Sequence, residues 1–221
     1  MSVSFQERSD FNELYQDYIH NFDKVKQFFS SDYKNPAEFV RCADAKRKSY
    51  LKGASFDRGV IADILKEQNE NFKSSEAALA NIEHLREDYT FAVVTGQQVG
   101  MLSGPLYTIY KALNTIKLAN ELSEKYPDYK FVPIFWLECE DHDFLEINNI
   151  TILDKANEPK KISYFDGGEA KEKYIKPVGK IVLDEYINKF KEELHEALQE
   201  TEFTADIFDS INKSYAEGTD M

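Results

Sequence analysis

The chain has 221 residues, 42% of them hydrophobic and 30% charged, a composition typical of a folded globular protein rather than a disordered one. Its 40 acidic and 27 basic residues give a formal net charge of −13, which argues against a nucleic-acid or anionic-membrane partner, because both need a basic face. The two cysteines, Cys42 and Cys139, are far apart in the sequence and give neither a disulfide framework nor a CxxC metal or redox pair. Without a signal peptide or an apolar run of about 18 residues, the sequence predicts a cytoplasmic protein.

The first part of the chain, residues 1–90, is predicted to be a helical N-terminal part of the core. Apolar and aromatic residues recur at helical spacing from 5 to 30, which predicts one long amphipathic helix. A polar stretch with the turn signal Asn35-Pro36 follows. Residues 57–86 return to helical spacing and are expected to form one or two further helices.

A ligand-binding strand–helix–strand unit is predicted over residues 91–150. Phe91–Val94 is β-prone and uncharged, as in a strand buried on both faces, and 131–137 is a second apolar run. Residues 105–122 between them have helical spacing. Such a unit places its two strands parallel with a right-handed crossover, although Pro133 argues against a fully paired central position for the second strand. The predicted fold class is therefore α/β with a parallel core.

The remaining residues are divided into a small β-hairpin insertion, 151–182, and a helical segment, 183–221. Turn signals separate three short apolar runs in the insertion, and residues 184–200 show the spacing of an amphipathic helix. The apolar runs expected to form strands are 151–153, 161–165 and 180–182.

The stretch TGQQVGMLSGPLYT follows the first predicted strand, at the carboxyl end of the sheet, where open α/β folds bind ligands. Gly104 is expected to be the N-cap and Pro105 the first residue of the helix, which would leave free N–H groups for an anion. The stretch matches neither a P-loop nor a dinucleotide-binding motif. A ligand cradle and an ordinary glycine-rich helix cap are equally good interpretations.

Side chains in and after this stretch could hold a ligand. Gln97 and Gln98 offer hydrogen-bond donors and acceptors for polar groups. Tyr107 and Lys111 are four residues apart and so share one face of the predicted helix.

A second polar stretch, ECEDHD at residues 138–143, follows the second predicted strand. Its carboxylates surround His142 and could fix the tautomer of that imidazole for acid–base chemistry. A solvated acidic loop is the alternative, and a metal site is less favoured because adjacent residues rarely all reach one ion. The acids disfavour a thiolate at Cys139, so no cysteine nucleophile is predicted. Because parallel strands end at one edge of a sheet, both polar stretches are expected to meet in one crevice.

Together, the two stretches resemble a known family. The sequences TGQQVGMLSGPLYTIYK and FWLECEDHDFLEIN are similar to the paired patterns TGQQxG…GPLYTxYK and FWxxxEDHDFxEIN of the cysteine-adding enzymes of bacillithiol biosynthesis, the BshC cysteine ligases. The resemblance spans essentially the whole chain but only the N-terminal part of that family. It implies a Rossmann-like, nucleotidyltransferase-type core that is incomplete in this chain, so we expect a truncated product or an N-terminal fragment.

The resemblance implies an activity and partners. Members of the family add cysteine to the amine of glucosaminyl-malate, and their full-length forms are homodimers with a C-terminal coiled coil. ATP is a candidate cofactor, although the histidines of the HxGH motif of related folds are absent here, and no metal is predicted. The alternatives are an adenylyl-transferring enzyme that acts on another small acid, and a non-catalytic remnant.

The chemistry of the side chains in the two stretches predicts roles for individual residues in such a reaction. His142, held by Asp141 or Asp143, is expected to orient the amine or accept its proton. Lys111 is expected to bind a carboxylate or phosphate. The other residues predicted to bind substrate or nucleotide are Thr95, Gly96, Gln97, Gln98, Gly104, Tyr107 and Glu140.

Overall fold

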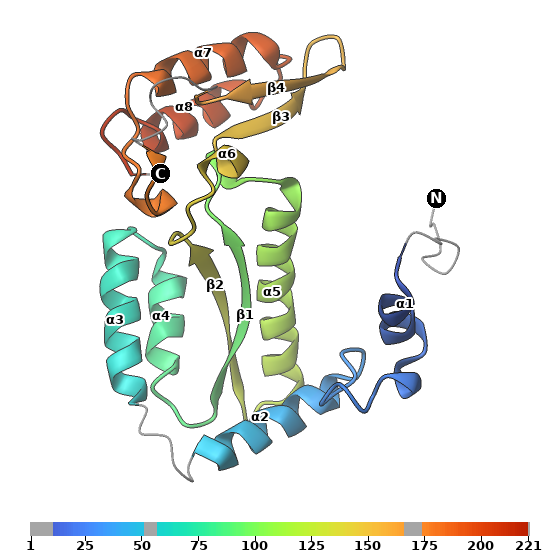
Figure 1. The fold of residues 1–221 in the computed structure, drawn as a ribbon. Helices are drawn as coiled ribbons and strands as arrows, with labels where there is room; N and C mark the ends of the chain where they lie inside the picture. The colour runs from blue at the N-terminus through green and yellow to red at the C-terminus, as the bar shows by residue number, and fades with distance from the viewer. Residues whose placement is uncertain (1–10, 51–56, 166–173, 221) are drawn as a thin grey trace. The chain divides into compact units, whose positions relative to one another are not determined.

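The structure, a computed structural model, describes residues 11–50, 57–165 and 174–220 (Figure 1). The chain divides into two compact units, each described here by itself. The four segments predicted from the sequence remain a prediction about domains. The N-terminal unit comprises residues 1–92 and 119–132, and the C-terminal unit comprises residues 93–118 and 133–221.

The first helix, α1 (Glu13–His20), is shorter than predicted. It begins at Asn12, whose side chain accepts a hydrogen bond from the Tyr15 N–H at 2.8 Å. After it comes only a single 3₁₀ turn, Phe22–Lys24. The prediction of one helix from 5 to 30 was therefore wrong, and its first residues lie outside the described part of the chain.

Aromatic packing explains why that helix stops early. The ring of Tyr18 lies 4.5 Å from Phe29 and 5.2 Å from Tyr33, measured between centroids. Such contacts require the chain to turn back on itself after α1. The aromatic residues thus stabilise a local cluster, which their spacing alone cannot distinguish from one face of a long helix.

Three further helices belong to the N-terminal unit: α2 (Pro36–Tyr50), α3 (Arg58–Asn71) and α4 (Glu76–His84). The last two confirm the prediction of helices within 57–86. The guanidinium group of Arg58 donates hydrogen bonds to the carbonyls of Leu85 and Thr90, both at 3.0 Å. These bonds tie the start of α3 to the chain that leads from α4 into the first strand.

Strands β1 (Thr90–Gln98) and β2 (Lys130–Glu138) pair with each other and are joined by helix α5 (Leu106–Lys125). The Lys130 N–H donates to the Tyr89 carbonyl at 3.0 Å, and at the other end the Val99 N–H donates to the Glu138 carbonyl at 3.4 Å. Residue numbers therefore increase in the same direction along β1 and β2, so the two strands run parallel (Figure 1). This confirms the predicted strand–helix–strand unit.

Strand β1 differs from the prediction in its length and burial. It continues past Val94 to Gln98, so the first four residues of the predicted loop are strand. Exposure alternates along β1, and Val94 is 59% exposed. The prediction of burial on both faces was wrong, because among the described residues only one strand pairs with β1 and successive side chains face opposite sides.

The C-terminal unit contains an antiparallel hairpin of β3 (Asn149–Leu153) and β4 (Pro159–Ser163), in register at Ile150 and Ile162. It confirms two of the three predicted strand runs. The prediction of a third strand at 180–182 was wrong, because Val182 forms only an isolated bridge with Asp220. The remaining elements are α6 (Phe144–Ile147), a 3₁₀ turn (Val178–Lys180), α7 (Tyr186–Ala197) and α8 (Thr204–Ser214).

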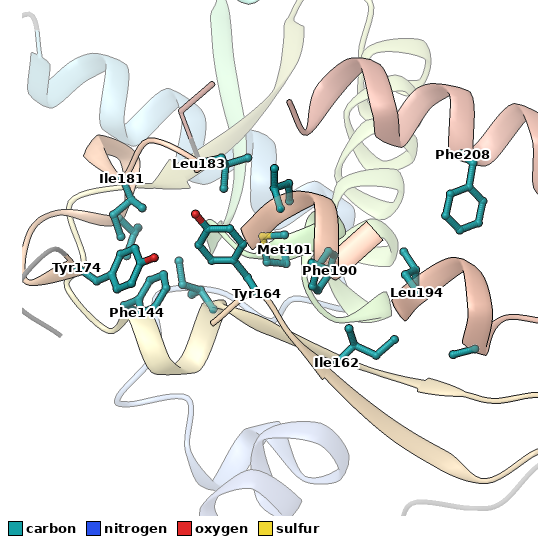
Figure 2. Packing of buried hydrophobic residues seen from close by; sticks show 14 residues of the cluster. Met101, Phe144, Ile162, Tyr164, Tyr174, Ile181, Leu183, Phe190, Leu194 and Phe208 are labelled. Atoms are coloured by element: carbon teal, nitrogen blue, oxygen red, sulfur yellow. The ribbon is translucent and has the colours of Figure 1, made fainter. Parts of the chain in front are cut away.

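A hydrophobic core joins these elements (Figure 2). Helix α7 packs along β4 and contributes the fully buried Phe190 and Leu194. Phe144 and Tyr174 stack with their centroids 4.0 Å apart. Met101, from the segment after β1, is also fully buried here. Burial of each large side chain stabilises the folded state by about 1.5–3 kcal/mol. Through Met101 and Phe144, the core therefore holds the segment that follows β1 and the segment that follows β2.

Candidate functional site

The two adjacent glutamines of β1 point to opposite sides of the strand and have different partners. Gln97 accepts a hydrogen bond from Lys111 Nζ at 3.0 Å and donates to the Tyr107 hydroxyl at 3.3 Å. Gln98 donates from Nε2 to Asp141 Oδ2 at 2.7 Å. Alternation along a strand explains this division. Gln98 thus joins the two polar stretches, whereas Gln97 contacts residues of α5. What either glutamine binds stays a prediction.

Lys111 provides a positive charge beside the end of β1. Its half-buried ammonium group donates to the Gly96 carbonyl as well as to Gln97, which uses two of its three N–H groups. It also lies 5.7 Å from the centre of the Tyr107 ring. The remaining N–H can bind an anion, as the sequence predicted, although that role stays a prediction.

Residues 99–105, here called the glycine turn, connect β1 to α5. They include a 3₁₀ turn, Met101–Ser103, and three successive residues with positive φ: Leu102 at 52°, Ser103 at 72° and Gly104 at 70°. Sequence reasoning did not predict this conformation. A non-glycine residue in this region costs about 1–3 kcal/mol, so the turn is strained.

The start of α5 is shifted from the predicted position. The helix begins at Leu106, not at Pro105, and the Gly104 N–H donates to the Met101 carbonyl at 3.0 Å. Gly104 is therefore not the predicted N-cap. Within the described part of the chain, the N–H groups of Leu106 and Tyr107 have no backbone acceptor. These are the donors that a helix start can offer to an anion.

Gly96 is required by the close approach of the two strands. A Cβ atom at this position would lie 2.8 Å from the Trp136 carbonyl oxygen and 2.9 Å from the Trp136 Cβ. Both distances are shorter than real Cβ contacts. The sequence predicted a ligand contact at this glycine, which stays a prediction, and the structure gives it a role in bringing the strand ends together.

Residues 139–143, here called the acidic loop, follow β2. Asp141 Oδ1 accepts hydrogen bonds from the N–H groups of His142 at 2.5 Å and Asp143 at 3.2 Å. Asp143 Oδ1 accepts from the Glu146 N–H at 3.1 Å and caps α6. Both carboxylates thus organise the backbone of the loop and of the helix that follows.

The imidazole of His142 is exposed to solvent. Across residues 11–50, 57–165 and 174–220, no hydrogen bond joins it to Asp141 or Asp143, because those carboxylates accept backbone N–H groups. The predicted contact that would hold the imidazole is therefore absent. Its ring nitrogens remain accessible to a substrate, and its catalytic role stays a prediction.

Two other predicted residues have no hydrogen-bonding partner for their side chains within the described residues. Thr95 is half-buried on β1, on the same side of the strand as Gln97, and Glu140 is exposed on the acidic loop. Their roles toward a ligand also stay predictions.

The acidic loop has an anchor that sequence reasoning missed. The N–H of Val178 donates to the Asp141 carbonyl at 2.8 Å, and the N–H of Gly179 donates to the Cys139 carbonyl at 3.0 Å. Only the Pro177-Val178-Gly179 run, a turn signal, could have drawn attention to this segment. Nothing in it predicts contact with residues so distant along the chain.

The described residues contain neither a metal-binding cluster nor a membrane-spanning helix. No group of three or more His, Cys, Asp or Glu side chains is placed to share a metal ion. No helix there has both the length and the apolar character needed to cross a membrane.

Comparison with known proteins places the sequence among relatives. Residues 1–221 match the family described as "Bacillithiol biosynthesis BshC, N-terminal Rossmann-like domain". The protein named "Putative cysteine ligase BshC" from Chloroherpeton thalassium is 36% identical over 213 residues, which cover 94% of this chain and 36% of that protein. Its namesake from Salinibacter ruber is 37% identical over 211 residues, which cover 95% and 36%.

A third relative shows the same partial coverage. The protein of the same name from Geobacillus kaustophilus is 43% identical over 152 residues, which cover 69% of this chain and 27% of that protein. The chain thus spans little more than a third of the length of the first two of these relatives.

Proposed function

Since this chain belongs to the BshC family of bacillithiol biosynthesis, we propose that it contributes the N-terminal site of a cysteine ligase. In the proposed reaction the amine of glucosaminyl-malate attacks the carboxyl carbon of cysteine; the amide C–N bond forms, one carboxyl C–O bond breaks, and that oxygen leaves together with the group that activates it. The observation that carries the proposal is the family match together with the Gln98–Asp141 hydrogen bond of 2.7 Å, which links the two polar segments. A cytoplasmic location and homodimers belong to the same proposal.

The α5 side of the site is suited to a negatively charged group. The free N–H groups of Leu106 and Tyr107 and the third N–H of Lys111 can all donate to a carboxylate or a phosphate. These residues fit an ATP phosphate as well as a substrate carboxylate. When bound, ATP would supply an activated carboxyl group, which a free carboxylate lacks toward an amine.

The acidic loop is suited to the amine. An amine attacks a carboxyl carbon only in its neutral form, so a proton must leave the ammonium before the C–N bond forms. The exposed imidazole of His142 can accept that proton. The exposed carboxylates of Glu140 and Asp143 beside it favour a cationic substrate.

Substitution of His142 tests this role. We expect His142→Gln to lower the rate of amide formation about 100-fold while the thermal unfolding temperature stays unchanged, because the imidazole makes no hydrogen bond within the described residues. The matched control is His195→Gln on α7, which should leave the rate unchanged. Turnover of His142→Gln within a few-fold of the unsubstituted protein would disprove the assigned role.

Deletion of the gene in its source organism tests the proposed reaction itself. Loss of bacillithiol with accumulation of glucosaminyl-malate, both quantified by mass spectrometry, would support cysteine addition. Unchanged pools would contradict it. In that case, ATP–pyrophosphate exchange that depends on a different small acid would identify an adenylyl-transferring enzyme.

A further inference from the structure

We propose that Gly179 is a positioning residue: its lack of a side chain lets the 3₁₀ turn Val178–Lys180 approach the acidic loop closely enough to set the place of His142. The proposal rests on the function proposed above, since it is this loop that carries the expected base.

Two backbone hydrogen bonds connect the turn to the loop. The donors are consecutive, Val178 and Gly179, and their acceptors, the carbonyls of Asp141 and Cys139, lie on either side of Glu140. The loop is therefore held at two points immediately before His142. The support itself is firm, because the Val178 side chain is fully buried in the hydrophobic core.

The contact leaves no room for a side chain at residue 179. A Cβ atom there would lie 2.7 Å from the Cys139 Cβ, 3.3 Å from the Cys139 carbonyl oxygen and 3.5 Å from its Sγ. The first distance is one that real Cβ atoms essentially never show, whereas the last is an ordinary van der Waals contact. It is thus the Cβ of Cys139, rather than its thiol, that excludes a larger residue.

Lack of space, rather than backbone conformation, excludes a larger residue at position 179. Gly179 is not among the described residues with positive φ, so its backbone conformation is open to alanine. An alanine at residue 179 must therefore push the turn and the loop apart, which weakens both hydrogen bonds. Because a displacement of about 1 Å at a reacting group can reduce a rate about 100-fold, even a small shift of His142 should be measurable.

The test combines Gly179→Ala with two changes at Cys139. Cys139→Gly removes the obstructing Cβ, whereas Cys139→Ala removes only Sγ and keeps that Cβ. Gly59→Ala, where the nearest atom to a new Cβ is a carboxylate oxygen of Asp57 at 3.0 Å, is the control for a tolerated glycine replacement. All variants are made in the protein as its gene encodes it.

Two readouts are measured for each variant. The first is kcat and KM for amide formation from cysteine and glucosaminyl-malate with ATP. The second is the imidazole Cε1–Hε1 NMR signal of His142, identified among the four histidines by its loss in His142→Gln. The NMR signal needs no turnover, so it tests the positioning role even where the proposed reaction is not observed.

We expect Gly179→Ala to lower kcat at least about tenfold with little change in KM, and to shift the His142 signal. Adding Cys139→Gly to Gly179→Ala should restore kcat to within about twofold and return the His142 signal to its original position. Adding Cys139→Ala should restore neither. If Gly179→Ala does not fold, the same pattern is expected in the yield of folded protein. An unshifted His142 signal with unchanged kcat in Gly179→Ala would overturn the proposal, as would equal rescue by the two Cys139 variants.

Discussion

The glycine turn and the acidic loop both follow parallel strands, yet they are held in different ways. The glycine turn contains three successive residues with positive φ, closes through its own Gly104–Met101 hydrogen bond and is held by Met101, which is buried in the hydrophobic core. The acidic loop has no residue with positive φ; besides the hydrogen bonds that Asp141 accepts from N–H groups of the loop, it is held by hydrogen bonds from Gln98, Val178 and Gly179. The glycine turn is thus tied to the rest of its unit by a buried side chain, and the acidic loop by hydrogen bonds from residues distant along the chain.

The largest effect is expected from Gly96→Ala, which should disturb both segments at once. A new Cβ would meet the backbone of β2, which cannot rotate away as a side chain can. We expect a loss of about 3 kcal/mol in the free energy of unfolding, measured by urea titration. A loss below about 1 kcal/mol would show that the two strand ends can separate without consequence.

The next largest loss of stability is expected from Tyr164→Phe, in the C-terminal unit that contains the acidic loop. Tyr164 is 2% exposed, and its hydroxyl donates to Asp184 Oδ1 at 2.6 Å. Tyr164→Phe leaves that carboxylate oxygen with one donor fewer and should cost about 2 kcal/mol. The matched control is Tyr126→Phe, since the Tyr126 hydroxyl has no hydrogen bond within the described residues; it should stay within about 0.5 kcal/mol in the same denaturant titration.

Tyr164 also predicts a dependence on pH. Burial, and then the hydrogen bond to Asp184, raise the pKa of Tyr164 above its ordinary value of 10.0. The folded state therefore keeps this proton more tightly than the unfolded state, and the stabilisation is complete below about pH 10 and lost as the pH rises further. Above pH 10, the free energy of unfolding should therefore fall less steeply with pH in Tyr164→Phe than in the unsubstituted protein. The same pH profile in both proteins would contradict the raised pKa of Tyr164.

A smaller pair of effects should separate the two sides of β1. Gln98→Ala should shift the His142 NMR signal, because it removes the donor to Asp141, while leaving Lys111 in place. Gln97→Ala should do the reverse: weaken ligand binding on the α5 side and leave the His142 signal unshifted. Each is expected to cost about 1 kcal/mol, and the same response to both variants would contradict the division of the site.

The smallest effect is expected in the glycine turn. The side chain of Ser103 is exposed and its φ is 72°, so Ser103→Gly should relieve backbone strain and raise the free energy of unfolding by about 0.5–1 kcal/mol. Ser210→Gly, at an exposed position within α8, is the control and should lower it by a similar amount. Destabilisation by Ser103→Gly would mean that the turn is not strained at this residue.

Much of the structure around these two segments could be predicted from the sequence. Helical and strand spacing identified β1, α5, β2 and the hairpin, because those elements depend on the periodicity of neighbouring residues. The motifs around Gln97 and His142 identified the family and the polar strand ends. Spacing was less reliable for the aromatic N-terminus, where Tyr18 packs against residues beyond the end of its own helix.

The sequence by itself therefore determined the parallel strand–helix–strand unit, the hairpin, the family and the positions of the polar residues along the chain. Tertiary structure alone decided that Gln97 and Gln98 serve opposite sides of β1, that Asp141 and Asp143 organise backbone N–H groups rather than the His142 imidazole, and that Gly179 supports the acidic loop. The physical reason is the range of the interactions. Periodicity depends on residues that are close in the sequence, whereas the 3.0 Å hydrogen bond from the Gly179 N–H to the Cys139 carbonyl forms only when the chain has packed.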